Sequence, residues 1–492
     1  MPPSAVSAFD ADVAVVGGGL AGLTAGVRAA QLGCRVVILE KGGQELYPCN
    51  SRYAGGYLHL AFHEPAMEVG ELVRSLRAKT PDDIDFTLVE TLARNARRTL
   101  IWLQQHAGAK FIWGGNERWQ RQLLAPPRPP RTSLVWLGRG PDLVLRNLAA
   151  AAHHLGARLL RGHEVVNISQ RGDGVYVVRC VAGGKGVSLS ALAVVLADGG
   201  FQANLEDLGR HIAKRPEAVL QRNARTGCGT GMRIARELGA KLTELSGFYG
   251  HLLSADAFTN EKLWPYPMVD PLAVAGILVD RAGRRFVDEG RGGVFVTNAL
   301  ARAEDPLGAT VVIDASIWET VGRSGRLPCN PMLPALGAAM HRADSLIDLA
   351  RTAGIDPDGL AETVRTYNAA VMDGRPERLD PGKSKSKIEI RPISQPPYYA
   401  IPVCAGITHT MGGVAITPSG AVQRASGGIV PGLFAAGATA GGLEGGRSAF
   451  YLGGLCKAAI LGLICGESAA RHIGRLPADG AVESGTAAGV SG

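Results

Sequence analysis

The sequence lacks the cysteine patterns that hold metals, iron–sulfur clusters or redox disulfides. Its eight cysteines are spread from Cys34 to Cys465, with no Cys-x-x-Cys pair and no Cys/His group of zinc spacing. We therefore expect reduced thiols and no metal site. Long hydrophobic runs are missing too, because no apolar stretch reaches the roughly 20 residues that span a bilayer. The first residues lack a basic region followed by an apolar one, so we expect no signal peptide. A cytoplasmic protein is expected.

Aromatic residues are scarce, at 5% of the chain, and they are not interleaved with basic stretches. This argues against a nucleic-acid partner. The net charge of +8 comes from scattered basic residues, with 383–387 as the one local run. Such a charge favours an anionic substrate, or it is simply a solvated basic surface.

Glycine, by contrast, is abundant. The 66 glycines are nearly twice the usual share of about 7%, and they gather in particular loops rather than in repeats. The length of 492 residues predicts two or three domains. This composition suits an enzyme whose backbone approaches a large cofactor at several points.

The segment 10–40 organises the chain. A short apolar run at 13–16 predicts a buried parallel strand, and Gly17, Gly19 and Gly22 follow with the spacing of a dinucleotide-binding turn. A helix over 20–32 and a second strand over 35–39 come next, and Glu40 stands where an acid accepts hydrogen bonds from a ribose. The order of these parts predicts a dinucleotide site with its phosphates at the helix N-terminus.

Further along the chain, 65–106 and 143–154 predict helices, and 126–130 predicts an exposed proline-rich loop. The stretches 175–181 and 187–192 predict a hairpin, and 193–196 predicts an apolar strand that ends in a glycine turn. The composition changes over about 241–389, which predicts a second, α+β domain with 383–387 and 392–397 as its exit linker.

Several motifs in order resemble the flavoprotein family of fumarate reductase and succinate dehydrogenase. Beside the N-terminal turn, they are Asn50-Ser51 with Gly55-Gly56, 197–201, 285–289, 409–413, 431–437 and 452–454. Segments 379–384 and 397–409 look most like tricarballylate dehydrogenases, with the flavin-containing half of a cobalamin-biosynthesis oxidase close behind. The resemblance implies an α/β fold in which a Rossmann-like FAD-binding domain (1–240 and 390–475) carries an inserted α+β capping domain (241–389), followed by a disordered tail (476–492).

The resemblance also implies bound FAD and the residues that contact it. The expected set is Gly17, Gly19, Leu20, Ala21, Gly22, Glu40, Lys41, Asn50, Ser51, Gly55, Gly56, Val165, Ala197, Gly199, Gly412, Gly437, Ala438 and Leu452. Members that attach FAD covalently use a histidine after the Asn50-Ser51 loop. This chain has Arg52-Tyr53 there, so non-covalent FAD is expected. Ala438 stands where many members have an acid.

Three residues are the candidates for catalysis. Arg291 is the nearest match to the family's acid/base arginine, although it follows Glu289 more closely than usual, and a surface or salt-bridging arginine is the alternative. His409 would bind a substrate carboxylate or be structural, because Thr408 replaces the first histidine of the common motif. Arg447 is the nearest match to a second substrate arginine. Arginine suits these roles because it stays charged and grips a carboxylate bidentately.

The leading functional hypothesis is an FAD enzyme that dehydrogenates, or in reverse reduces, a C–C bond beside a carboxylate of a small polycarboxylic acid, as tricarballylate dehydrogenases do. An alternative is a desaturase of a bulkier substrate, like ketosteroid dehydrogenases, with Tyr249, Tyr266 and Tyr398 as acid/base candidates. Another is a flavin electron-transfer subunit of a larger complex. The resemblance also implies an iron–sulfur or quinone-linked acceptor protein as partner, through which the protein would associate with a membrane.

Overall fold

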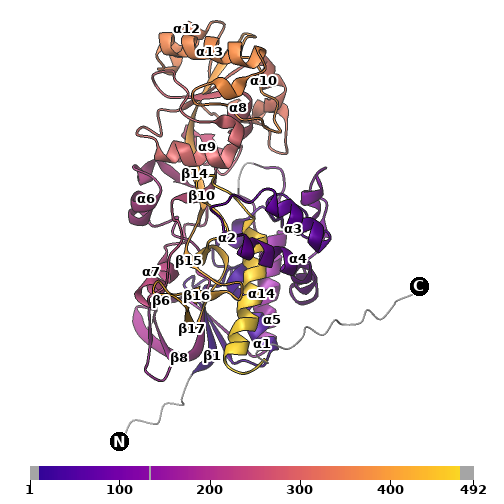
Figure 1. Cartoon of the computed structure of the whole chain (residues 1–492), viewed down its shortest axis with the longest axis vertical. Coiled ribbons are helices and arrows are strands. Elements are labelled where there is room, and N and C mark those ends of the chain that lie inside the picture. Colours follow the sequence, from indigo (N-terminus) through magenta and orange to yellow (C-terminus); the bar gives the residue numbers. More distant parts are fainter. Residues whose placement is uncertain (1–9, 132–133, 477–492) are drawn as a thin grey trace, which may run out of the picture.

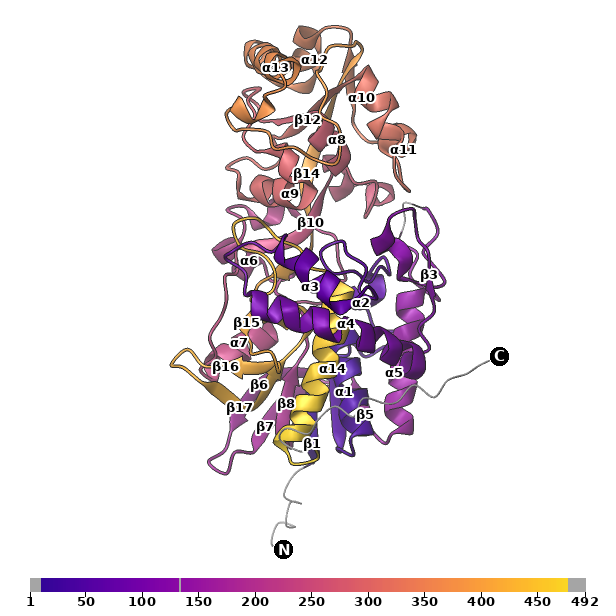
Figure 2. The same cartoon turned by 45° about the vertical axis from the view of Figure 1, so that its right-hand side comes forward.

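The computed structural model describes residues 10–131 and 134–476, and the predicted disordered tail lies outside them apart from Leu476. The described chain forms two lobes, one above the other, and its first and last elements both belong to the lower lobe (Figures 1 and 2). The lower lobe holds the N-terminal turn and the C-terminal helix. The upper lobe is built mainly from the middle of the chain, coloured rose to orange in Figure 1.

The lower lobe is organised by a mixed sheet with strand order β16-β17-β8-β1-β2-β5, which β6 and β7 extend beside β8. Strand β1 pairs in parallel with β2 and β8, with Val13 opposite Val36 and Ala193. Its residues are fully buried, as expected of a central parallel strand that is covered on both faces. The strands are β1 (Ala11–Val16), β2 (Val36–Glu40), β5 (Arg158–Arg161), β6 (His163–Gln170), β7 (Tyr176–Ala182), β8 (Lys185–Leu196), β16 (Ala421–Gln423) and β17 (Ile429–Ala435).

Helices pack beside this sheet, and two of them approach each other closely. A Cβ at Gly462 would lie 2.5 Å from the Ala21 carbonyl oxygen, so glycine lets the C-terminal helix lie against the first one. The helices of this lobe are α1 (Leu20–Gln31), α2 (Asn50–Tyr53), α3 (Val69–Arg77), α4 (Phe86–Ala107), α5 (Gly140–His154), α6 (Leu205–His211), α7 (Thr230–Glu237) and α14 (Gly454–His472). Short pairs complete it: β3 (Phe111–Ile112) with β4 (Leu123–Leu124), and β15 (Val414–Ala415) with β18 (Ala440–Gly441).

The α/β class and the Rossmann-like FAD-binding fold predicted from the sequence are confirmed, and two local expectations are corrected. The helical stretch 65–106 forms two helices, α3 and α4, because Pro81 and the Asp85 cap separate them. The hairpin strand at 187–192 and the strand at 193–196 are one continuous strand, β8. One end of β8 pairs antiparallel with β7, and the other pairs in parallel with β1.

The upper lobe has its own sheet, with order β10-β14-β12-β11 and with β9 and β13 also paired to β14. These strands are β9 (Val219–Gln221), β10 (Gly247–Ser254), β11 (Ile277–Val279), β12 (Thr310–Asp314), β13 (His341–Ala343) and β14 (Tyr398–Met411). The helices around it are α8 (Asp270–Ala275), α9 (Gly293–Arg302), α10 (Ala315–Glu319), α11 (Cys329–Ala335), α12 (Leu346–Ala353) and α13 (Pro357–Met372). The predicted domain boundaries stay a prediction, with β14 running from the upper lobe down to the lower one (Figure 1).

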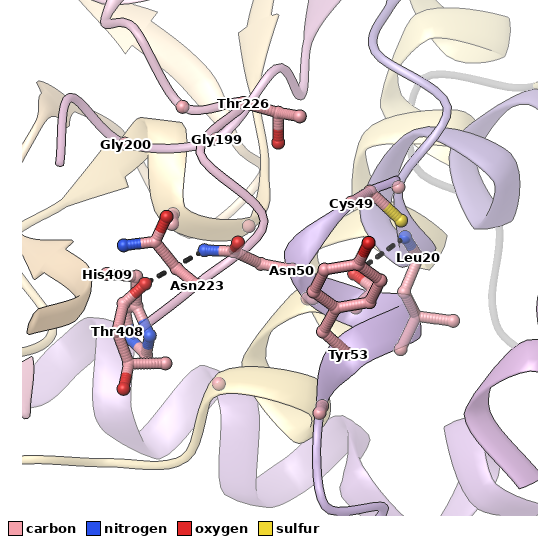
Figure 3. Close-up of a pocket in the computed structure, with 18 of the residues that line it drawn as sticks. Leu20, Cys49, Asn50, Tyr53, Gly199, Gly200, Asn223, Thr226, Thr408 and His409 are labelled. Carbon is pink, nitrogen blue, oxygen red and sulfur yellow. Dashed lines mark hydrogen bonds between the residues drawn. The ribbon is translucent and has the colours of Figure 1, made fainter. Parts of the chain in front are cut away.

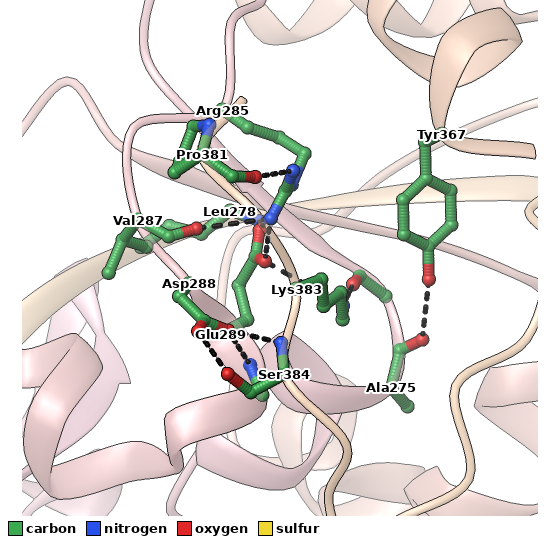
Figure 4. Close-up of polar contacts among 12 residues, drawn as sticks. Ala275, Leu278, Arg285, Val287, Asp288, Glu289, Tyr367, Pro381, Lys383 and Ser384 are labelled. Carbon is green, nitrogen blue, oxygen red and sulfur yellow. Dashed lines mark hydrogen bonds and ion pairs between the residues drawn. The ribbon is translucent and has the colours of Figure 1, made fainter. Parts of the chain in front are cut away.

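Polar side chains are buried inside the upper lobe, where the sequence predicts an exit linker (Figure 4). Arg285 grips Glu289 through Nε at 3.0 Å and Nη2 at 2.5 Å. Lys383 is fully buried, donates to the Gly276 carbonyl, and has its Nζ 3.8 Å from Glu289 Oε2. Lys383 is therefore not a linker residue. Burial is tolerated because the carboxylate and the carbonyl compensate its charge.

The remaining composition-based expectations concern cysteines and membranes. The eight cysteines are all free thiols, and Cys228 alone is exposed. Within the described ranges, no helix is both long and apolar enough to cross a membrane.

Candidate active site

The N-terminal turn forms the floor of a cavity of about 500 Å³ at the junction of the two lobes. Gly17 adopts φ +103°, and a Cβ on it would lie 2.5 Å from the Ala197 carbonyl oxygen. A Cβ at Gly22 would lie 1.9 Å from the Gly17 oxygen, so α1 contacts the turn directly. Both positions require glycine for the protein's own packing.

At other glycines, the backbone faces the cavity with no side chain in between. A Cβ at Gly19 would meet only the Ser51 hydroxyl, at 3.5 Å, and one at Gly55 or Gly199 would meet nothing within 4 Å. All three glycines line the cavity. Because they face open space rather than protein, the cradle has room for the phosphates and ring of a dinucleotide. The residues present therefore fit FAD.

Glu40 lies at the end of β2 and is almost fully buried. Its Oε2 accepts from Gly18 N at 2.8 Å, and its Oε1 accepts from Gly42 N at 2.7 Å. Burial raises the pKa of Glu40, against the lowering effect of these two backbone amides. Glu40 lines the cavity. Each of its carboxylate oxygens has a second lone pair, which can accept a hydrogen bond from a ribose hydroxyl.

Asn50 and Ser51 join the cradle to the rest of the cavity (Figure 3). Ser51 accepts from Leu20 N at 3.1 Å, at the start of α1. Asn50 Nδ2 donates to the Thr408 carbonyl at 3.0 Å, and its Oδ1 accepts from Ala224 N. Figure 3 shows this amide between α2 and the end of β14. The loop is thus a fixed wall rather than a free surface turn.

Arg52 and Tyr53, which replace the covalent-attachment histidine, take different places. Arg52 is buried in an ion pair with Asp142, whose other oxygen binds Arg146 at 2.7 Å. Tyr53 lines the cavity, whereas Arg52 does not. Neither side chain carries the imidazole that a histidyl–flavin bond needs, so non-covalent FAD stays the prediction.

Two glycine turns from distant segments close the cradle. Thr439 Oγ1 accepts from Gly199 N at 3.0 Å and donates to Asp198 Oδ1 at 3.2 Å. Asp198 Oδ2 in turn accepts from Gly231 N at the start of α7. Most of the predicted cofactor set lines the cavity, namely Gly17, Gly19, Leu20, Ala21, Glu40, Lys41, Asn50, Ser51, Gly55, Gly56, Val165, Ala197, Gly199, Gly437 and Ala438. Gly22, Gly412 and Leu452 do not line it, and all contact roles stay predictions.

The three residues predicted to be catalytic differ in their position relative to the cavity. His409 lines the cavity, but Arg291 and Arg447 do not. Arg291 is exposed, with its guanidinium 3.6 Å from the centre of the Phe295 ring. Arg447 is also exposed, and its backbone N–H donates to Asp83. Neither arginine is therefore placed by this structure where a substrate in the cavity would touch it.

Two other arginines line the cavity in their place, and sequence reasoning missed both. Arg222 donates to Thr408 Oγ1 and to the Pro265 carbonyl, each at 3.0 Å, and its guanidinium lies 4.8 Å from the Tyr266 ring centre. Arg128 lies 5.4 Å from the same ring and is only 9% exposed, so this one side chain is buried within the expected exposed loop at 126–130, whose ends Pro126 and Pro130 are exposed. Thr408, which replaces the family's histidine, thus holds Arg222.

Tyr266 lies close to both of these cations. Burial alone would raise its pKa, but the charges and hydrogen bonds of Arg222 and Arg128 outweigh burial and lower it. The cluster is a positively charged corner with a phenol that gives up its proton more readily than usual. It suits a carboxylate or a polarised carbonyl oxygen.

A stacked pair of tyrosines forms another wall. The rings of Tyr249 and Tyr451 lie 3.8 Å apart between centres at 17°, and the His409 ring centre lies 5.4 Å from that of Tyr249. Tyr451 accepts from Gly454 N at 2.9 Å, which leaves its own proton to donate. Burial lowers the pKa of His409 to about 4, so this histidine is neutral near pH 7, and its Nε2 has no partner among the described residues.

Of the tyrosines named as acid/base candidates, Tyr249 and Tyr266 line the cavity and Tyr398 does not.

A buried ion pair lies at the N-terminal end of α14, where Lys457 binds Glu444. Glu444 Oε1 also accepts hydrogen bonds from Leu452 N and Gly453 N at 3.2 Å. Among the described residues, no group of three or more metal-ligating side chains is present.

Comparison with known proteins identifies the family of this chain. The family model described as an FAD binding domain matches residues 12–449. The chain is 29% identical over 493 residues to a fumarate reductase (cytochrome) of Shewanella frigidimarina, covering 94% of this chain and 77% of that protein. It is 23% identical to a vinyl phenol reductase of Lactiplantibacillus plantarum, covering 94% and 96%. The crystal structure of a 3-ketosteroid-Δ4-(5α)-dehydrogenase from Rhodococcus jostii matches with a TM-score of 0.72 at 22% identity, covering 95% and 99%.

Proposed function

The chain belongs to the FAD-binding flavoprotein family that includes fumarate reductase, and we propose that it transfers hydrogen across a C–C bond next to a carboxylate or carbonyl. It is an FAD-dependent oxidoreductase. The observation that carries the proposal is the single cavity that joins the glycine cradle to the Arg222–Tyr266–Arg128 corner and the Tyr249–Tyr451 wall.

FAD supplies hydride acceptance and donation when it is bound. The chain's own contribution is position and charge. Gly19 and the start of α1 offer backbone N–H groups to phosphate, and Glu40 offers acceptors to a ribose. The Asn50–Thr408 bond holds this cradle against β14, so cofactor and substrate positions are fixed to each other.

The arginine corner supports an acidic or carbonyl-bearing substrate. Arg222 and Arg128 both lie close to the Tyr266 ring, and Arg222 is held by Thr408 and Pro265. A group bound there would feel two positive charges and a readily donated phenol proton, which stabilise negative charge developing on its oxygen. We infer that this corner replaces the role predicted for Arg291 and Arg447.

The other lining residues favour a substrate with an apolar body. Aromatic side chains around the cavity are Tyr53, Tyr57, Phe62, Trp119, Tyr249, Trp264, Tyr266 and Tyr451. Lys41 and Lys457 also line it, but Lys41 donates to the Thr226 carbonyl and Lys457 is paired with Glu444. One carboxylate plus a ring or chain therefore fits better than the small polycarboxylic acid of the tricarballylate-like hypothesis.

A second candidate is a bulkier neutral carbonyl substrate, as in ketosteroid dehydrogenases. The stacked Tyr249 and Tyr451 favour it, because the free Tyr451 proton can polarise a ketone oxygen without a carboxylate being present. An electron-acceptor protein, iron–sulfur or quinone-linked, is proposed as the partner that turns the flavin over. The relative named a fumarate reductase (cytochrome) supports such coupling.

The test is anaerobic flavin spectroscopy of the purified holoenzyme. Reduced enzyme is mixed with fumarate, citraconate, an arylacrylate and 4-androstene-3,17-dione, and oxidised enzyme with tricarballylate. Reoxidation by the arylacrylate supports the leading proposal, reoxidation by the steroid the second candidate, and a response to fumarate, citraconate or tricarballylate the polycarboxylate hypothesis. A stable bound flavin that responds to none of them contradicts hydrogen transfer at such bonds.

Paired variants then locate the substrate corner. Arg222→Met should lower kcat/KM by about 30-fold or more, since removing one hydrogen-bonded charge from a binding site costs about 2 kcal/mol or more. Arg291→Met should leave kcat/KM within about threefold, which is a ΔΔG‡ below about 1 kcal/mol. The reason is that Arg291 is exposed and does not line the cavity. The reverse pattern would return the catalytic role to Arg291.

A further inference from the structure

We propose that Tyr249, His251 and Asp270 form a proton relay that serves the substrate carbon next to the activating group. The proposal rests on the hydrogen-transfer function above and adds the route of its proton. Tyr249 is the catalytic residue, His251 takes and returns its proton, and Asp270 is the positioning residue.

The relay is built by strand geometry. Tyr249 and His251 lie two residues apart on β10, which places both side chains on the same face of the sheet. His251 Nε2 lies 2.9 Å from the Tyr249 hydroxyl, and Nδ1 lies 2.7 Å from Asp270 Oδ2. Asp270 is the first residue of α8, and its Oδ1 accepts from Leu252 N at 2.8 Å. The carboxylate is thereby fixed by the strand that carries the histidine.

In the proposed relay, the proton positions follow from the partner of each ring nitrogen. An ionised aspartate only accepts, so His251 Nδ1 carries a hydrogen toward Asp270. In the neutral ring, Nε2 is then an acceptor, and the Tyr249 O–H donates to it. The histidine side chain is 14% exposed and that of Asp270 11%. The arrangement matches the base and orienting-carboxylate logic known from hydrolytic triads, with a phenol in place of the serine.

The relay opens on the reaction cavity. Tyr249 and His251 both line it, whereas Asp270 stands behind them. Tyr249 stacks on Tyr451 and faces His409, whose pKa of about 4 makes it a poor base. Burial raises the pKa of Tyr249, Arg222 opposes that rise, and Tyr266, Asp270 and Glu444 add to it, so the phenol needs the histidine behind it to give up its proton. Of the groups on this wall, Tyr249 alone has a dedicated base behind it among the described residues.

The proton balance is simple in each direction. In dehydrogenation, Tyr249 oxygen takes the α-proton as its own proton moves to His251 Nε2, and the β-hydrogen leaves the substrate with its electron pair, for which bound FAD would supply the hydride acceptor. The resulting imidazolium is held by the Asp270 carboxylate and releases its proton to solvent. In reduction, every step reverses, and solvent supplies the proton through His251.

One experiment tests the relay without any substrate. Proton NMR of the oxidised holoenzyme should show a strongly downfield resonance from the His251 Nδ1 hydrogen, as expected of a short bond to a carboxylate. The resonance should persist in Tyr249→Phe and vanish in His251→Gln and Asp270→Asn. Its absence in wild type, or its survival in His251→Gln, overturns the relay whatever the enzyme's substrate is.

The second arm uses whichever compound changes the flavin spectrum in wild type. Tyr249→Phe and His251→Gln should each slow flavin oxidation or reduction by about 100-fold or more, with FAD content and substrate Kd unchanged. The double variant should be no slower than the slower single variant, because the residues act as one unit. Tyr398→Phe, outside the cavity, is the matched control. Rates within threefold of wild type in Tyr249→Phe, or multiplicative losses in the double variant, overturn the relay while leaving hydrogen transfer intact.

Discussion

Replacing Gly19 by alanine should separate cofactor binding from folding. Gly19 precedes α1 with φ −72° and ψ −178°, which any L-residue adopts. A methyl group there would meet only the Ser51 hydroxyl, at an ordinary 3.5 Å. The protein without FAD should therefore lose no stability, and the lower entropy of its unfolded chain adds about 0.4–1 kcal/mol.

With FAD present, the outcome should be the opposite. The methyl group would occupy the surface where the backbone must approach the pyrophosphate. We expect the FAD Kd to rise by at least about tenfold, which is about 1.4 kcal/mol. The assay is a titration of stripped protein with FAD, followed by flavin fluorescence, beside thermal unfolding without FAD.

Two other glycine variants serve as controls for Gly19→Ala. Gly22→Ala should destabilise the stripped protein by about 3 kcal/mol or more, because its methyl group would lie 1.9 Å from a backbone oxygen that cannot move freely. Gly186→Ala, with nothing within 4 Å of its Cβ, should leave the FAD Kd unchanged and should gain the same small stability from its unfolded chain as Gly19→Ala. An unchanged FAD Kd in Gly19→Ala would refute phosphate binding at the start of α1.

Three further predictions concern buried titratable side chains. Lys457→Met should cost about 3–5 kcal/mol in urea unfolding, because it leaves Glu444 buried without its cation, and adding Glu444→Gln should recover part of that loss. Burial lowers the pKa values of His59 and His409 from 6.5 to about 4, so the unfolded chain binds protons first and Tm should fall as pH drops from 6.5 toward 4, less steeply in His59→Asn. Glu40→Ala should weaken FAD binding, and an unchanged flavin content would remove Glu40 as the ribose acceptor.

The cofactor cradle could be predicted from sequence because its contacts are local. Gly17, Gly19, Gly22 and Glu40 lie within one strand–helix–strand unit, where spacing along the chain dictates spacing in the fold. The family resemblance supplied the later turns in their order, and the family match over 12–449 confirms it.

The substrate corner could not be predicted in the same way. Arg128, Arg222 and Tyr266 converge from segments with no shared pattern, and a proline-rich stretch around Arg128 is typical of an exposed loop. Lys383 was misplaced for a related reason, since a run of lysines predicts solvent exposure and its compensating acid, Glu289, lies far away in sequence. One signal was available for the wall beside that corner: Tyr249 and His251 stand two residues apart, the spacing that would place both side chains on one face of a strand.

Hydrogen transfer from the reduced flavin to a C=C bond is tested by the stoichiometry of a single turnover. Anaerobically reduced holoenzyme is mixed with the compound that reoxidises it fastest, and flavin absorbance and product mass are measured in the same sample. We expect one product molecule, heavier by two hydrogens across its former C=C bond, for each flavin reoxidised. Flavin reoxidation without that product, or a fully reduced flavin beside every unsaturated carboxylate and ketone offered, would contradict it.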